Sequence, residues 1–424
     1  MIKNKVVAIF PIIATIIVIL LTIQTIKRNS NKENNTSNIE YTEQDFNIKL
    51  IKEVNKTNKT NYLISPYSIE IALNMLKVGA KGNTLKEIEN LIGNRKINDV
   101  TIKDRVSVAN AAFIKNEYKE YILDSYINTL NNNYNSELLY DNFKTPKVIN
   151  DWVNNKTNGM IDKILDDIDK EFVLGLANAL AIDVEWNTHF ECTSTSGKKF
   201  TKNDGNSYEV EMMHKILEDK SSKYLKNDNA TGVIISYKNY NSKTGEENSK
   251  NDNTLEFIGI LPNDNIDNYI DNLTDDELNN LLSSAKIANN NFSINLSLPR
   301  FKYDYEIEDF INVLKNLGIN NAFDKEKADF SNIISKNIES LYVGEAIHKT
   351  HIDLNEKGTK AAAVTYFGTY KATSREPKEK EIVNIEFNKP FIYIIRDKET
   401  KEMLFFGTVY EPNEWNGSTC SENN

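Results

Sequence analysis

Histidine side chains are the first groups to test for chemistry, because they serve both as metal ligands and as proton-transfer groups. The sequence contains four of them and two cysteines, which leaves little material for a metal centre. His348 and His351 are three residues apart in a stretch with strand character. Their side chains should therefore face opposite sides of the strand and not share a metal ion. We expect His348 to be a buried histidine whose hydrogen bonds are satisfied.

Other catalytic signatures are missing from the sequence. It has no G-x-S-x-G, H-E-x-x-H or C-x-x-C pattern. The glycines of GAKGNT, residues 79–84, resemble a phosphate-binding loop only superficially, and the end of a helix explains Gly79 better. Carboxylates are scattered as solvated helix faces, without an isolated pair in an apolar setting. We therefore expect no enzymatic activity, no metal and no cofactor.

Charge and cysteine content restrict the classes of partner. The 61 acidic and 51 basic residues give a net charge of -10, and no basic face with interleaved aromatics stands out. This composition argues against nucleic-acid binding. Cys192 and Cys420 are too few for a disulfide framework, and Cys420 lies in a polar tail, so we expect no structural bridge.

An apolar stretch near the N-terminus, residues 6–26, contains no charged side chain. About 20 such residues suffice to cross a bilayer. A cleaved signal peptide would have a shorter apolar core and small residues before the cut, whereas this stretch is followed by Lys27 and Arg28. We expect residues 1–27 to be an uncleaved transmembrane anchor, and the protein to be secreted if the segment is removed. Basic residues on both sides leave the orientation open.

Helix caps, glycines and apolar patterns predict the helices and strands in the rest of the chain. Residues 28–43 are polar and are predicted to form a flexible stalk. Ser65 is a suitable N-cap for a helix that ends at Gly79, and Thr84 with Glu87 predicts a capping box for the next helix. Further helices are predicted from residue 46, over 145–159, 265–285 and 305–317. Strands are predicted near 105–115, 174–185, 208–213, 231–237, 255–261, 290–298, 340–354, 381–387, 390–396 and 402–410.

Early helices followed by late strands, without regular alternation, predict an α+β fold rather than a doubly wound sheet. The length of 424 residues allows one large domain with a sizeable core, or two to three small ones. One stretch, NEKGTKAAAVTYFGTY at 355–370, fits no ordinary element. Its three adjacent alanines favour helix, while Gly358 before them and VTYF after them favour strand.

Six blocks of sequence, in order from Phe46 to Pro412, resemble segments of the serpin family. They are NYLISPYSIEIALNMLKVGAKGNT, INDWVNNKTNGMIDKIL, ANALAIDVEWNTHF, LPRFKYDYEIEDFINVLKNLGINNAFDKEKADFS, HKTHIDLNEKGTKAAAVT and FNKPFIYIIRDKETKEMLFFGTVYEP. The resemblance implies a serpin domain over residues 44–413, with helices packed around three β-sheets and an exposed reactive-centre loop. A polar tail, residues 414–424, would follow it.

The resemblance also implies a role for the stretch that begins with NEKG. In serpins this run is the hinge of the reactive loop, which inserts as an extra strand into a large sheet after a serine protease has cut the loop. The implied hinge residues are Glu356, Gly358, Thr359, Ala361, Ala362, Ala363 and Thr365. An inserting strand turns alternate side chains into the core, and those at 359, 361, 363 and 365 are small and uncharged. Inhibition would use strain stored in a metastable fold and end in a covalent complex.

The position of the reactive bond follows from counting along the loop as in the family. The count from Glu356 gives Ala372–Thr373, which would suit a protease with a small specificity pocket. The loop before FNKPF is longer than usual, so Lys371–Ala372 and Arg375–Glu376 remain alternatives, and these would suit a trypsin-like protease. Papain-like cysteine proteases are further candidate targets.

A second set of residues resembles the region where the serpin sheet opens. It comprises Ser65, Ser68, Asn178, Trp186 and His348. The two hydroxyls, the amide and the imidazole are predicted to form a hydrogen-bonded cluster that parts and re-forms as the sheet opens. Trp186 resembles the tryptophan at the top of the sheet, where insertion begins.

The leading interpretation is a membrane-anchored, monomeric inhibitor of serine proteases whose serpin domain is extracellular. One alternative is a non-inhibitory serpin-fold binding or scaffold protein at the cell surface. Such proteins usually carry charged or bulky residues, or proline, at inward hinge positions, and none occurs between Thr359 and Thr365. A surface adhesin is another alternative, for which only the anchor, the stalk and the asparagine-rich composition speak.

Overall fold

The computed structural model describes residues 43–247, 255–335, 341–359 and 380–417. They belong to one compact unit, Thr42–Asn424. The predicted anchor and residues 28–42 of the predicted stalk lie outside the described residues. Within the described part of the chain, no helix is long and apolar enough to cross a membrane.

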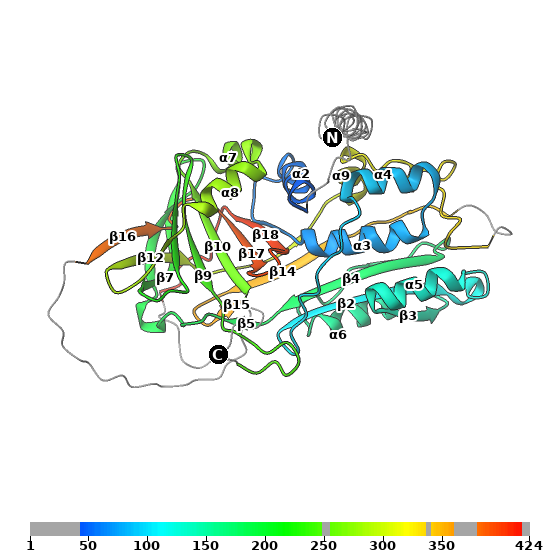
Figure 1. The fold of residues 1–424 in the computed structure, drawn as a ribbon, viewed down its shortest axis with the longest axis horizontal. Helices are drawn as coiled ribbons and strands as arrows, with labels where there is room; N and C mark the ends of the chain where they lie inside the picture. Colours follow the sequence, from blue (N-terminus) through cyan, green and yellow to red (C-terminus); the bar gives the residue numbers. More distant parts are fainter. Residues whose placement is uncertain (1–42, 248–254, 336–340, 360–379, 418–424) are drawn as a thin grey trace, which may run out of the picture. The chain divides into compact units, whose positions relative to one another are not determined.

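Among the described residues, five α-helices precede residue 160 and three follow residue 265 (Figure 1). They are α2 (Glu43–Asn55), α3 (Pro66–Gly79), α4 (Gly82–Ile92), α5 (Asp124–Tyr134), α6 (Lys147–Lys156), α7 (Ile266–Asn272), α8 (Asp275–Ser283) and α9 (Phe310–Asn316). The predicted N-cap is confirmed, because the side chain of Ser65 accepts a hydrogen bond from the Ser68 amide at the start of α3.

The described strands form four hydrogen-bonded sheets. The first is β1 (Tyr62–Ile64), β18 (Met403–Val409), β17 (Phe391–Asp397), β10 (Leu255–Pro262), β9 (Ala230–Ser236), β8 (Lys223–Lys226) and β11 (Lys286–Ile287). The second is β16 (Glu381–Glu386), β12 (Phe292–Pro299), β7 (Ser207–Leu217) and β6 (Ser196–Thr201). The third is β13 (Phe301–Glu306), β14 (Lys349–Leu354), β15 (Gly358–Thr359) and β5 (Val184–Glu185), and the fourth is β3 (Ser136–Asp141), β2 (Val106–Lys115) and β4 (Leu174–Ile182).

The third and fourth sheets meet at β4 and β5, which follow one another along the chain. β15 pairs with β14 on one side and with β5 on the other. Away from β15, toward Leu174 on β4 and Lys349 on β14, the described strands β4 and β14 belong to different sheets and share no ladder. The third and fourth sheets are therefore divided along the line between β4 and β14. The short strand β15 joins them at one end of this line, which we call its upper end.

Alternating side chains of β2 and β4 serve two separate cores. Phe113 and Ala179 pack with Trp152 of α6 in the smaller cluster. Ile114 and Leu180, one residue further along each strand, belong to the main core. Both faces of these strands therefore contact apolar residues, although Ser107, Asn110 and Asn178 interrupt their apolar sequences.

Two features predicted at helix ends, the capping box and the glycine at residue 79, had different outcomes. The predicted capping box is wrong, because the hydroxyl of Thr84 accepts from the amide of Asp329 and the carboxylate of Glu87 accepts from the amides of Asn320 and Asn321. These side chains bind a distant segment instead of their own helix. Gly79 does end α3, and a Cβ there would lie 2.2 Å from Cγ1 of Ile333.

Three longer predicted elements also differ from the structure. The predicted helix 265–285 is two helices, since the side chain of Thr274 caps a new one. The predicted helix 305–317 begins as strand β13 and becomes helix α9 only at Phe310. The predicted strand 340–354 is a strand only from Lys349 onward, and residues 341–348 have no regular structure.

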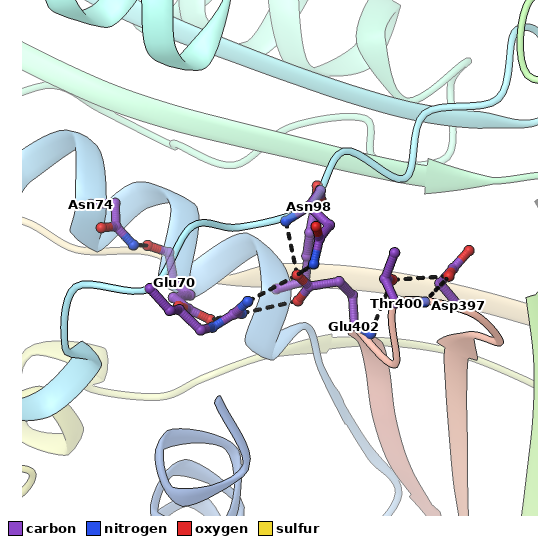
Figure 2. A network of polar contacts seen from close by, with 8 residues as sticks. Glu70, Asn74, Asn98, Asp397, Thr400 and Glu402 are labelled. Atoms are coloured by element: carbon purple, nitrogen blue, oxygen red, sulfur yellow. Dashed lines mark hydrogen bonds and ion pairs between the residues drawn. The ribbon is translucent and has the colours of Figure 1, made fainter. Parts of the chain in front are cut away.

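A polar network ties α3 to the turn between β17 and β18 (Figure 2). Arg95 forms two parallel hydrogen bonds of 2.9 Å with the buried carboxylate of Glu402, and its Nη2 also lies 2.5 Å from Glu70 on α3. The backbone and side-chain amides of Asn98 donate to the same Glu402 oxygen. Burial raises the pKa of Glu70 to about 6, although Arg95 opposes the shift. The network fixes the helix that carries Ser65 against the central seven-stranded sheet.

Candidate functional site

The predicted hinge begins as a tight turn between β14 and β15. The amide of Asn355 donates to the carbonyl of Gly358, and Leu354 pairs with Thr359. Gly358 and Thr359 pair on their other side with Glu185 and Val184. The start of the hinge thus already occupies the place of a strand between β14 and β5.

The carbonyls of residues 355–357 in the turn all accept hydrogen bonds from the segment that follows β5. The indole Nε1 of Trp186 donates to the carbonyl of Asn355, and the Trp186 backbone amide donates to that of Lys357. The amide of Phe190 donates to the carbonyl of Glu356 between them. Trp186 is fully buried. The turn is thus bound by residues 186–190, the segment after β5, and it lies between β14 and β5. We call this bound position of the turn the seat of the hinge.

Glycine is required at 358 by the close approach of two backbones. A Cβ on Gly358 would lie 2.0 Å from the carbonyl oxygen of Val184, well inside van der Waals contact. The next residue, Thr359, is buried, and its hydroxyl lies 2.7 Å from that of Tyr237. The Tyr237 ring stacks on Trp186 with 4.5 Å between ring centroids.

Glu356, predicted as the hinge glutamate, is anchored by Arg300. Its buried carboxylate accepts from Nε of Arg300 at 2.8 Å and from Nη2 at 2.6 Å, and it also hydrogen-bonds the hydroxyl of Thr195. A paired arrangement of this kind is both strong and directional. The ion pair therefore links the turn to Arg300, the residue directly before β13.

A groove lies below the turn, along the division between β4 and β14. Thr359 closes its upper end. Its other lining residues come from β4, from β14 and from beneath: Leu180, Ala181, Ile182, His351, Ile352, Asp353, Met160, Ile161 and Phe405. A strand entering here would continue β15 between β4 and β14, which share no ladder with each other in the described part of the chain.

The predicted sheet-opening residues are only partly brought together. The backbone amide of Ser65 donates to Nε2 of His348 at 2.9 Å, and Ser65 Oγ accepts from the amide of Ser68 at 3.1 Å. The side chain of Asn178 instead donates to Asn110 on the neighbouring strand. The hydrogen-bonded group thus contains Ser65, Ser68 and His348, and Asn178 belongs to a second pair.

His348 is buried beside Phe310, with 6.0 Å between the ring centroids. Burial lowers the pKa of its imidazole to about 3, so the ring is neutral and accepts the Ser65 amide at Nε2. His351 lies on β14, where its Nδ1 lies 2.8 Å from Asp304 on β13. The two imidazoles therefore have different hydrogen-bond partners, and the strand that was predicted to carry both begins only after His348.

Several contributors to the site were not singled out from the sequence. They are Arg300, Thr195, Tyr237, Phe190 and Asn110. Arg300 stands in the LPRF block, so its proximity to a family segment was visible, whereas its pairing with Glu356 required the fold. Tyr237 ends an apolar strand and carried no signal beyond its residue type.

Some predicted residues cannot be placed. Those that lie outside the described residues are Ala361, Ala362, Ala363, Thr365, Lys371, Ala372, Thr373 and Arg375. The cysteine prediction is wrong in one respect, since Cys192 is disulfide-bonded. Cys420, the other cysteine of the sequence, also lies outside the described part.

Comparison with known proteins identifies the family to which this fold belongs. The family described as Serpin (serine protease inhibitor) matches residues 41–412. Serpin A3-3 of Bos taurus is 30% identical over 382 residues, which cover 84% of this chain and 84% of that protein. The chain therefore belongs to the serpin family, and the predicted fold is confirmed.

Two solved structures of tengpin, a thermophilic serpin, are similar to the whole domain. The native state is 32% identical, with a TM-score of 0.72, and the match covers 89% of this chain and 95% of that chain. The latent state is 30% identical, with a TM-score of 0.68 and coverage of 90% and 99%.

Proposed function

We propose that the protein is a suicide-substrate inhibitor of serine proteases, tethered to a membrane by residues 1–27. The observation that carries the proposal is the seat of the hinge. Gly358 and Thr359 already pair as a strand between β14 and β5, next to the groove between β14 and β4. The small side chains that follow in the sequence suit entry into that groove.

The covalent step begins at the proposed reactive bond, Ala372–Thr373. The serine hydroxyl of the target protease attacks the Ala372 carbonyl carbon, and its proton passes through the protease's own base to the amino group of Thr373. The peptide bond breaks, Thr373 leaves as a free amine, and an ester joins Ala372 to the protease. Cleavage at Lys371–Ala372 or Arg375–Glu376 would follow the same chemistry with a trypsin-like protease.

Insertion then competes with hydrolysis of the ester. The residues that follow Thr359 insert into the groove and form backbone hydrogen bonds with β4 and β14. The attached protease is carried along with the strand. In this mechanism the chain supplies no catalytic group of its own, and it acts as a monomer with an extracellular serpin domain.

The proposal is tested by mixing the full chain with a panel of serine proteases. A protease-sized adduct that survives denaturing gel electrophoresis is expected, and mass spectrometry of the released C-terminal fragment identifies the reactive bond. The cut protein should also unfold at a higher temperature than the uncut protein. Clean cleavage without an adduct and without a thermal gain would favour the alternative, a serpin-fold binding or scaffold protein.

A further inference from the structure

The chain continues past the family match as a short extra strand beside β7. The amide of Glu211 donates to the carbonyl of Asn413 at 3.1 Å, and the amide of Trp415 donates to the carbonyl of Glu209 at 2.9 Å. β12 pairs with β7 only from Met212 onward. Residues 413–415, which we call the C-terminal strap, therefore occupy the position beside β7 that β12 leaves empty.

Trp415 fastens the strap to β6. Gly197 on that strand leaves room for the indole, since a Cβ there would lie 2.7 Å from Trp415 Cδ1. Gly197 is also the direct partner of Glu211 in the β6–β7 ladder. The indole thus packs over the strand pair whose other edge the strap covers, and Cys192, just before β6, is disulfide-bonded.

Asn413 holds the backbone of Arg300. Its amide donates to the Arg300 carbonyl at 3.2 Å, and its side-chain Oδ1 accepts from the amide of Lys302 at 3.2 Å. The Arg300 amide donates to the carbonyl of Glu211, whose own amide donates to the strap. The Glu211 carboxylate lies 3.6 Å from Nη1 of Arg300. The strap therefore fixes both Arg300 and the second carboxylate beside its guanidinium.

We propose that Asn413 and Trp415 are positioning residues for the hinge, acting through Arg300 on Glu356. An arginine side chain carries about 2 kcal/mol of rotamer entropy, so its two hydrogen bonds to Glu356 depend on a fixed starting point. The strap provides that point, and the 355–358 turn stays seated between β14 and β5. Without the strap, the turn leaves its seat more often, and the groove below it opens more often.

Hydrogen exchange of the full chain tests the first link without any protease. Asn413→Ala removes the Oδ1 acceptor of the Lys302 amide, and Trp415→Ala removes the indole that packs on Gly197. Each, compared with wild type, should speed amide exchange in residues 355–359 by about fivefold, as expected for the loss of one net hydrogen-bond or packing contribution. Gly197→Ala should do the same from the opposite side, because its methyl group displaces the indole while the strap is intact. The double variant of Gly197 and Trp415 should exceed neither single variant by much.

Two controls separate positioning from general weakening. Glu414→Ala alters an exposed side chain within the strap and should leave exchange unchanged. Ile88→Val removes one methyl group from a buried site on α4 and should lower the unfolding midpoint without speeding exchange in residues 355–359. Equal exchange in the strap variants and in Ile88→Val would overturn the proposal.

A second measurement links the strap to the proposed function, on which only this step depends. A labelled synthetic peptide, KAAAVTYFGTYKA, copies residues 360–372 and should enter the groove about fivefold to tenfold faster in the strap variants. If exchange increases but no form of the protein takes up the peptide, groove insertion fails while the strap's hold on the hinge stands. If exchange is unchanged, the strap proposal fails whatever the peptide does.

Discussion

The hydroxyl groups of Thr359 and Tyr237 lie 2.7 Å apart and are both buried. The Tyr237 ring stacks on Trp186, and the two planes are inclined by only 8°. The last described residue of the hinge is therefore hydrogen-bonded to the aromatic pair that closes the top of the groove. This contact fixes the register in which any added strand must begin.

A double-mutant cycle measures that contact. Thr359→Val keeps the side-chain shape but leaves the Tyr237 hydroxyl buried without its partner, and should destabilise the protein by about 1–3 kcal/mol. Tyr237→Phe should have a similar effect through Thr359. Because the double variant removes both polar groups, it should cost less than the sum of the two. The midpoint of urea unfolding gives each value, and strict additivity would mean that the hydroxyls do not interact.

Removing the Arg300 side-chain charge should weaken the hinge seat strongly. Arg300→Met removes the guanidinium from the buried Glu356 carboxylate, and breaking such a buried ion pair typically costs about 3–5 kcal/mol. Lys302→Met is the matched control, because its ion pair with Asp353 is largely exposed and should be worth less than about 1 kcal/mol. Equal losses of stability in the two variants would show that Arg300 does not anchor the turn.

Much of the fold was predictable because family blocks carry both its elements and their order. Ser65 and Pro66 mark the start of α3 by local chemistry that needs no tertiary context, whereas Gly79 at its end also packs closely against Ile333. Thr84 and Glu87 also match a local capping pattern, yet their side chains accept hydrogen bonds from the backbone amides of Asp329, Asn320 and Asn321, which belong to a distant segment and not to their own helix. Capping signals alone cannot report such competition.

The same difference between local signals and distant contacts applies to the residues of the candidate site. Glu356, Gly358 and Thr359 were identified from the family pattern that follows NEKG, because that segment is continuous in sequence. Arg300 was not, since its partner is 56 residues away and no periodicity connects them. Asn178 illustrates the opposite error, because a family position was assumed to join one cluster and its amide instead donates to Asn110.

A bulky charge at an inward hinge position should convert the inhibitor into a substrate. Ala363→Arg would bring a bulky guanidinium to the narrow groove that Leu180 and Ile352 help to line, and its desolvation slows insertion relative to hydrolysis of the ester. The proportion of cleaved protein should rise and the covalent adduct should fall at least tenfold on denaturing gels, if the barrier to insertion rises by about 1.4 kcal/mol. Lys360→Arg is the control on the predicted outward face and should trap protease normally. An undiminished adduct with Ala363→Arg would rule out insertion of residue 363.

The neutral, buried state of His348 makes stability depend on pH. Its pKa is lowered to about 3 by burial, from the ordinary value of 6.5. Between these values the unfolded chain binds a proton that the folded protein does not, so the contribution is complete above pH 6.5 and is lost as pH falls. The slope approaches about 1.4 kcal/mol per pH unit. Glu70 acts in the opposite direction between pH 6 and 4.5, because burial raises its pKa to about 6.

Comparison with His348→Gln isolates the histidine, since Glu70 and all other groups titrate in both proteins. The glutamine Oε1 can still accept the Ser65 amide, so the variant keeps the local hydrogen bond. Urea unfolding of both proteins from pH 7.5 to 4.5 should show the stability advantage of wild type shrinking by about 2–3 kcal/mol toward the acid end. A difference that stays constant over this range would mean that His348 titrates alike in the folded and unfolded states, and that its buried contact with Ser65 does not require the neutral ring.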